Sequence, residues 1–380
     1  MNSAPDEPDV SDGLNSGEFE DALTSEELDD LTEAESEVQQ VLYSGQDFDI
    51  EGLVRRINKG DIVVPQFGQV DPSLETAGFQ RGFVWNRRQM DRFIESLLLG
   101  FPIPGVFFVR QGDRRYLVLD GQQRLMTLRD FYEGVHRGRE FALNNVAERF
   151  QGLTYKRLPE ELRRTLDNAF IQATIVDTDG TSASLDSVYQ IFERLNSGGT
   201  QLTPHEIRVA LFAGELVELL ESLNQLQQWR ELYGQKSARI RDQELILRII
   251  ALYVASEHYS RPLKTFLNAF AGAQRDGKSS ELRDAAKLFE SAADVLSRGP
   301  GQQALRKASR QVNAAQTEAI FVGLMRRLAS GDVAPDDVSR VVEGLRHDSD
   351  FDAATGRATA DEEPVSSRLR TATKAFAAIQ

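Results

Sequence analysis

A short polar cluster between two apolar segments holds the residue types in this sequence that are best suited to chemistry. Residues 116–119 are apolar, which predicts a short buried strand, and the cluster Asp-Gly-Gln-Gln-Arg follows at 120–124. Leu125, Leu128 and Phe131 come next at the spacing of one helix face. The cluster is therefore predicted to lie where a strand leads into a helix N-terminus, a place where backbone N–H groups bind anions.

The side chains of this cluster fit a phosphate site. Arg124 carries a planar guanidinium that suits phosphate, and Gly121 lets a ligand approach the backbone closely. Asp120 has a carboxylate of the kind that orients a water molecule or holds a metal ion. The same local pattern also fits a plain strand–helix junction with a solvated arginine. Only the surrounding sequence can distinguish these two interpretations.

Two other segments carry residues of the same chemical kind. Gln80 and Arg81 precede a loop with Trp85, in which the arginine suits phosphate and the tryptophan suits stacking on a base. A lone tryptophan more often packs in a core, which is the alternative for Trp85. Asn196 follows a predicted helix and precedes a glycine pair, where it is either part of a helix cap or the wall of a site.

Residues 272–279 match the phosphate-binding loop pattern letter by letter. That motif requires a buried strand before it, and here the preceding residues 261–270 are predicted to be an amphipathic helix. We therefore interpret this match as accidental.

The composition excludes several classes of chemistry. The 380 residues include no cysteine, which excludes disulfides, thiolate catalysis and cysteine-ligated zinc, and the four histidines are too widely spaced to form a metal-ligand pair. No apolar run reaches membrane-spanning length and the N-terminus lacks a signal pattern, so we expect a cytoplasmic protein. The net charge of −15 lies almost entirely in residues 1–40, which hold 14 Asp or Glu and no Lys or Arg. Such a tail is expected to be disordered and solubilising, with mimicry of nucleic acid as the alternative.

Hydrophobic periodicity predicts an α+β fold, in which a small mixed α/β domain precedes an all-α helical domain. The boundaries are a disordered acidic tail at 1–44, the mixed α/β domain at 45–200 and the helical domain at 201–380. Strands are predicted at 62–64, 105–110, 115–119, 141–151 and 170–176. The main helices are predicted at 46–57, 89–99, 125–135, 159–167, 183–195, 203–213, 215–228, 240–257, 261–270, 279–297, 301–329, 334–346 and 363–378.

Four blocks in this order resemble the GmrS-type family of ParB-like domains, which occur in modification-dependent restriction and phage-defence proteins and have long been catalogued as a domain of unknown function. The blocks are residues 79–86, 117–128, 189–200 with 202–208, and 241–248, and the resemblance covers about residues 45–270. It implies a ParB/sulfiredoxin-like fold, in which Gln80 and Arg81 face the loop at 120–124 and a nucleoside triphosphate is bound and, in several branches, hydrolysed.

The resemblance also implies roles for single residues. Asp120, Gln122, Gln123 and Arg124 are the candidate catalytic residues, and Asp120 is also the candidate ligand for Mg²⁺. The candidate nucleotide-binding residues are Gln80, Arg81, Trp85, Gly121 and Asn196.

Three functions stay open at this point. The first is an NTPase of a DNA restriction or anti-phage system, the second is a non-catalytic nucleotide or DNA sensor that partners a separate effector, and the third is a DNA nuclease. Many relatives carry a histidine-rich C-terminal HNH nuclease domain, but residues 280–380 hold one histidine and are expected to lack it. DNA is a further expected partner, a membrane is not, and oligomers are compatible with the sequence. A set of arginines would form the basic patch for DNA phosphates: Arg81, Arg87, Arg88, Arg92, Arg110, Arg114 and Arg115.

Overall fold

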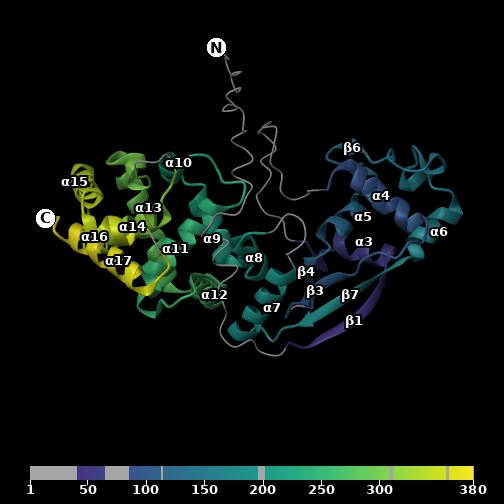
Figure 1. Cartoon of the computed structure of the whole chain (residues 1–380), viewed down its shortest axis with the longest axis horizontal. Coiled ribbons are helices and arrows are strands. Elements are labelled where there is room, and N and C mark those ends of the chain that lie inside the picture. Colours follow the sequence, from purple (N-terminus) through teal and green to yellow (C-terminus); the bar gives the residue numbers. More distant parts are fainter. Residues whose placement is uncertain are drawn as a thin grey trace, which may run out of the picture.

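The computed structural model of the chain describes residues 41–64, 85–112, 114–195, 202–307, 311–356 and 359–379. A mixed sheet flanked by helices forms the N-terminal part of these residues, and helices form almost all of the rest (Figure 1). The α+β prediction is therefore confirmed. The acidic tail at 1–40, the glutamine–arginine pair at 80–81 and Asn196 lie outside the described residues.

The main sheet has five strands in the order β1-β7-β3-β4-β2. Their bounds are β1 Tyr43–Asp49, β7 Phe170–Asp177, β3 Val106–Arg110, β4 Tyr116–Asp120 and β2 Ile62–Val63. β1 pairs antiparallel with β7, and β3 with β4, whereas β3 and β7 are parallel, as are β2 and β4. A separate hairpin of β5 Val135–His136 and β6 Arg139–Glu140 follows helix α5.

Each face of the sheet has its own core, because successive side chains of a strand point to opposite faces. Val118 of β4 belongs to the core formed with α3 Ile50–Asn58, α4 Arg87–Leu98, α5 Gln122–Glu133 and α6 Glu160–Asn168. Leu117 and Leu119 belong to the second core, which α7 Ser182–Leu195 shares. The strand that leads to Asp120 is thus packed on both sides.

The second core continues through the helical part of the chain as far as its last helix. These helices are α8 Pro204–Leu211, α9 Glu215–Asn224, α10 Gln227–Tyr233, α11 Arg241–Ala255, α12 Leu263–Ala273, α13 Ser280–Arg298, α14 Ala314–Leu328, α15 Pro335–Arg346, α16 Ser349–Ala354 and α17 Glu362–Ala377. α8 begins with a capping box: Thr203 Oγ1 accepts from the Glu206 amide at 3.1 Å, and Glu206 Oε2 accepts from the Thr203 amide at 2.6 Å.

Four element predictions were wrong. The predicted single helix at 215–228 is divided into α9, which ends at Asn224, and α10, which begins at Gln227. The predicted helix at 46–57 is a strand up to Asp49, whose side chain caps α3 by accepting from the Gly52 amide at 2.6 Å. The predicted strand at 141–151 is irregular and ends in a 3₁₀ turn at 148–150. The predicted single helix at 301–329 is a 3₁₀ turn at 301–304 followed by α14, because Asn313 caps the latter with its side chain.

Within the ranges that the structure describes, every helix is too short or too polar to cross a membrane.

Candidate functional site

The loop between β4 and α5 has the geometry expected at 120–124. β4 ends at Asp120, Gly121 follows with φ of 95°, and α5 begins at Gln122. A Cβ atom at position 121 would lie 2.4 Å from Cγ1 of the buried Val106, and φ lies in the left-handed region that L-residues rarely adopt. Glycine is therefore required for the close packing of this turn.

Among the described residues, no side chain caps the N-terminus of α5. α4 and α8 differ from it, because both begin with complete capping boxes, at Asn86 and Thr203. The N–H groups of a helix's first turn have no acceptor within the helix and carry the positive end of its dipole. The start of α5 is thus suited to a bound anion.

Arg124 is fixed beside this turn. Its Nη2 donates to Asp120 Oδ2 at 2.8 Å and to the Gly105 carbonyl at 2.9 Å. The Arg124 side chain is 16% exposed, whereas that of Asp120 is 46% exposed. Nε of Arg124 is buried and has no hydrogen-bond partner among the described residues. Asp120 therefore orients Arg124, and one of its oxygens is already used for this purpose.

Gln123 joins the start of α5 to the start of α4. Its Oε1 accepts from the Trp85 amide at 3.1 Å, and its carbonyl accepts from Thr127 Oγ1 at 2.7 Å. Trp85 is half-buried and packs edge-to-face against Phe93 with the ring centroids 5.4 Å apart. The structure thus brings Trp85 and Gln123 together through a hydrogen bond from the Trp85 main chain to the Gln123 side chain. Gln122 lies half-buried in the first turn of α5.

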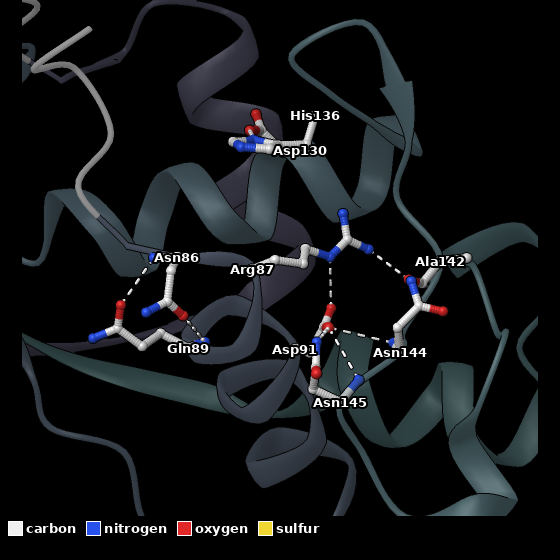
Figure 2. Close-up of polar contacts among 9 residues, drawn as sticks. All are labelled: Asn86, Arg87, Gln89, Asp91, Asp130, His136, Ala142, Asn144 and Asn145. Atoms are coloured by element: carbon white, nitrogen blue, oxygen red, sulfur yellow. Dashed lines mark hydrogen bonds and ion pairs between the residues drawn. The ribbon is translucent and has the colours of Figure 1, made fainter. Parts of the chain in front are cut away.

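The beginning of α4 is held in place by a buried carboxylate (Figure 2). Asp91 is fully buried and accepts from Arg87 Nε at 2.9 Å and from the Asn145 side chain at 2.7 Å. Its Oδ2 also accepts from the backbone amides of Asn144 and Asn145. Arg87 donates to the Ala142 carbonyl at 2.5 Å. These bonds fasten α4 to the irregular segment at 142–145, so they also fix where Trp85 meets Gln123.

Two of the arginines expected in a DNA patch form ion pairs with carboxylates of the protein itself. Arg87 pairs with Asp91, and Arg110 pairs with Asp177 at 3.3 Å. Arg88 and Arg92 of α4 and Arg114 and Arg115 before β4 are exposed.

The accidental phosphate-loop match at 272–279 has the context that was predicted. It spans the end of α12 and the turn before α13, with no strand before it in this described part of the chain. Lys278 is mostly exposed and lies 3.7 Å from Asp276. This segment lacks the architecture of a nucleotide-binding loop.

Charged residues of α7 and α8 are buried against the helical part, a feature that our sequence analysis did not identify. Glu193 lies 3.3 Å from Lys264 of α12, and Arg208 Nε donates to Asn268 at 2.9 Å. His205 is buried between Arg208 and Gln243, and burial with the adjacent Arg208 charge holds its pKa well below the usual value. The signal that could have identified these buried residues is the presence of charged residues within helices that are predicted to be apolar.

Asp242 and Glu244 lie in the first turn of α11, where the positive end of the helix dipole favours acidic side chains. Both are buried and paired: Asp242 lies 2.8 Å from Arg230, and Glu244 lies 3.6 Å from Arg208. In the described ranges, no group of three His, Cys, Asp or Glu residues is placed to hold a metal ion.

A comparison with known protein families gives a match over part of the chain. Residues 50–213 match the family described as GmrSD restriction endonuclease, N-terminal domain. No curated protein matches the chain. The matched region runs from α3 to the end of α8 and contains Trp85 and the β4–α5 loop. Over residues 50–213, the chain is similar to GmrSD-type N-terminal domains.

Proposed function

We propose that the protein binds a nucleoside triphosphate at the start of α5 and hydrolyses it as part of a DNA restriction or anti-phage system. The observation that carries this proposal is the placement of Arg124, held by Asp120 and the Gly105 carbonyl beside a helix start without a side-chain cap. A phosphate group there meets the N–H groups of the first turn and a guanidinium whose orientation is already fixed.

Phosphoryl transfer requires mainly that the reacting groups are positioned and that the negative charge of the phosphate is neutralised. Arg124 supplies the positive charge, and Gln122 in the first turn of α5 is the side chain that would orient the attacking water. Gln123 is occupied with the Trp85 amide and holds the start of α4 in place. If Mg²⁺ accompanies the triphosphate, Asp120 would hold it through the carboxylate oxygen that is not bonded to Arg124, and the ion would neutralise phosphate charge.

The biological setting of the proposal comes from the family, which is named for a restriction endonuclease. We propose DNA as the partner that alters turnover and a separate effector protein as the recipient of the signal. The exposed Arg88, Arg92, Arg114 and Arg115 are the proposed phosphate contacts of that DNA. A cytoplasmic location is consistent with this role.

The test is phosphate release from ATP, GTP, CTP and UTP with Mg²⁺, with and without DNA. We expect turnover by the wild-type chain and its loss in Asp120→Ala and Arg124→Ala. Lys278→Ala, in the accidental phosphate-loop match, is the control and should turn over normally. Nucleotide binding that needs Arg124 but gives no phosphate would instead identify a sensor. A wild-type chain that neither binds nor hydrolyses any of the four nucleotides would refute the proposal.

A further inference from the structure

A buried polar cluster attaches α7 and α8 to the helical part of the chain. We call it the α12 cluster, and its members are Glu193, His205, Arg208, Glu244, Lys264 and Asn268. It contains two cations and two anions, all of them nearly or fully removed from solvent.

One face of α12 holds both preceding helices. Lys264 Nζ lies 3.3 Å and 3.5 Å from the two carboxylate oxygens of Glu193, and the two side chains are 2% and 11% exposed. Asn268, one helical turn further along α12, accepts from Arg208 Nε at 2.9 Å. The same surface of α12 therefore binds α7 through an ion pair and α8 through a hydrogen bond.

Arg208 extends the cluster to α11. Its Nη1 lies 3.3 Å from His205 Nδ1 and 3.6 Å from Glu244 Oε1. Buried ion pairs offset their desolvation cost only when their geometry is maintained, and removal of one partner is strongly destabilising. The cluster consequently restricts where α7 and α8 lie relative to α12.

α7 in turn supports the strand that leads to the candidate site. Leu117 and Leu119 of β4 share one close-packed core with Val188 and Phe192 of α7. β4 ends at Asp120, which orients Arg124. Because packed interiors transmit displacements, a shift of α7 would move the base of the β4–α5 loop.

We propose that Lys264 is a positioning residue for the nucleotide site, acting through Glu193 and α7. The inference rests on the proposed function and adds to it that the helical part is required for nucleotide affinity. Lys264 itself is not a catalytic residue, since its ammonium is buried against Glu193.

A second buried ion pair, remote from α7, provides a matched control for the pair of Lys264 and Glu193. Glu318 of α14 is 1% exposed and accepts from Arg248 and Arg368, each at 2.5 Å. α14 packs mainly against α11, α13 and α17. Glu318→Gln therefore damages a buried charge cluster of the same kind, whose ion pairs are made with α11 and α17 and not with α7.

The experiment compares full-length wild type with Lys264→Met, Glu193→Gln and Glu318→Gln. Affinity for fluorescently labelled ATP and GTP is measured at a temperature at which every variant is folded, together with the melting temperature. We expect Lys264→Met and Glu193→Gln to weaken binding by roughly tenfold or more. Glu318→Gln should lower the melting temperature but keep the affinity within about twofold. An affinity in Lys264→Met as close to wild type as that of Glu318→Gln would overturn the proposal.

A second measurement separates this inference from the proposed function. Hydrogen exchange of the amides at 117–124 should be faster in Lys264→Met than in wild type, and unchanged in Glu318→Gln. If the wild-type chain bound no nucleotide, the proposed function would fail, while hydrogen exchange would still decide whether Lys264 supports the β4–α5 loop. Equal exchange in both variants would refute the positioning role, and it would do so whether or not nucleotide binds.

Discussion

At the scale of a single residue, the conformation of the β4–α5 loop depends on a glycine at position 121. Its φ is 95°, and an added Cβ would lie 2.4 Å from Val106 Cγ1. We predict that Gly121→Ala lowers the free energy of unfolding by roughly 2–4 kcal/mol, because strained backbone and overpacking act together. Chemical denaturation of the variant and of wild type measures the difference.

Gly134 provides the control for that substitution at the other end of the same helix. It also has a positive φ, of 78°, but an added Cβ would find no atom within 4 Å. Gly134→Ala should therefore cost only the backbone strain, about 1–2 kcal/mol. Equal losses in the two variants would show that Val106 does not restrict position 121.

His205 is a second single residue with a measurable consequence. It is neutral when folded, because burial and the neighbouring Arg208 lower its pKa, whereas in the unfolded chain its pKa returns to the ordinary value near 6.5. Below that pH the unfolded chain binds a proton that the folded chain does not, so stability is lost as the pH falls.

We predict that wild type loses stability more steeply than His205→Gln below pH 6.5, by up to about 1.4 kcal/mol per pH unit. The measurement is the free energy of unfolding of both proteins between pH 5 and pH 8. The other three histidines are common to both proteins and cancel in the difference. Parallel curves would mean that His205 takes up a proton in the folded protein as readily as in the unfolded one.

The elements that position the site were largely predictable from sequence. Local patterns predicted a strand at 115–119 and a helix from 125, and the structure has β4 at Tyr116–Asp120 and α5 from Gln122. The contact between Trp85 and Gln123 was not predictable, because it joins two segments through a main-chain amide. β1 was missed for a related reason: its residues are mostly exposed, so its hydrogen bonds to β7 rather than its apolar pattern define it.

The attachment of α4 to the segment after β6 leads to a prediction at the scale of elements. The Asp91 carboxylate accepts from Arg87, from two backbone amides and from the Asn145 side chain (Figure 2). Asp91→Asn replaces an acceptor with an N–H donor that faces other donors, so we expect a loss of roughly 2–3 kcal/mol in unfolding free energy.

Glu95→Gln is the matched control one turn along α4. Glu95 accepts from the Ala147 amide at 2.6 Å, but at an exposed position, so the expected loss is below about 1 kcal/mol. Denaturant unfolding of both variants tests the ranking. A loss in Asp91→Asn no larger than in Glu95→Gln would show that α4 is held mainly by its apolar face.

At the scale of the whole molecule, the second core connects the sheet to the last helix. It contains Leu119 of β4, Phe192 of α7 and Phe376 of α17. In the described part of the chain, the residues before and after residue 200 therefore share one continuous apolar core. The α12 cluster adds buried ion pairs across the same position. We therefore predict that the part containing the main sheet and the helical part unfold in one cooperative transition, even though the family match ends at residue 213.

The two tryptophans make this prediction measurable. Trp85 lies beside α5, and Trp229 is fully buried among the helices, packed near Phe289 and Phe321. Trp85→Phe leaves a probe of the helical part, and Trp229→Phe leaves a probe of the candidate site. In each variant, the denaturant midpoint from fluorescence should coincide with the midpoint from circular dichroism. A Trp85 transition that precedes the loss of helical signal would mean that the sheet unfolds independently, and Lys264 would then have no rigid path to the β4–α5 loop.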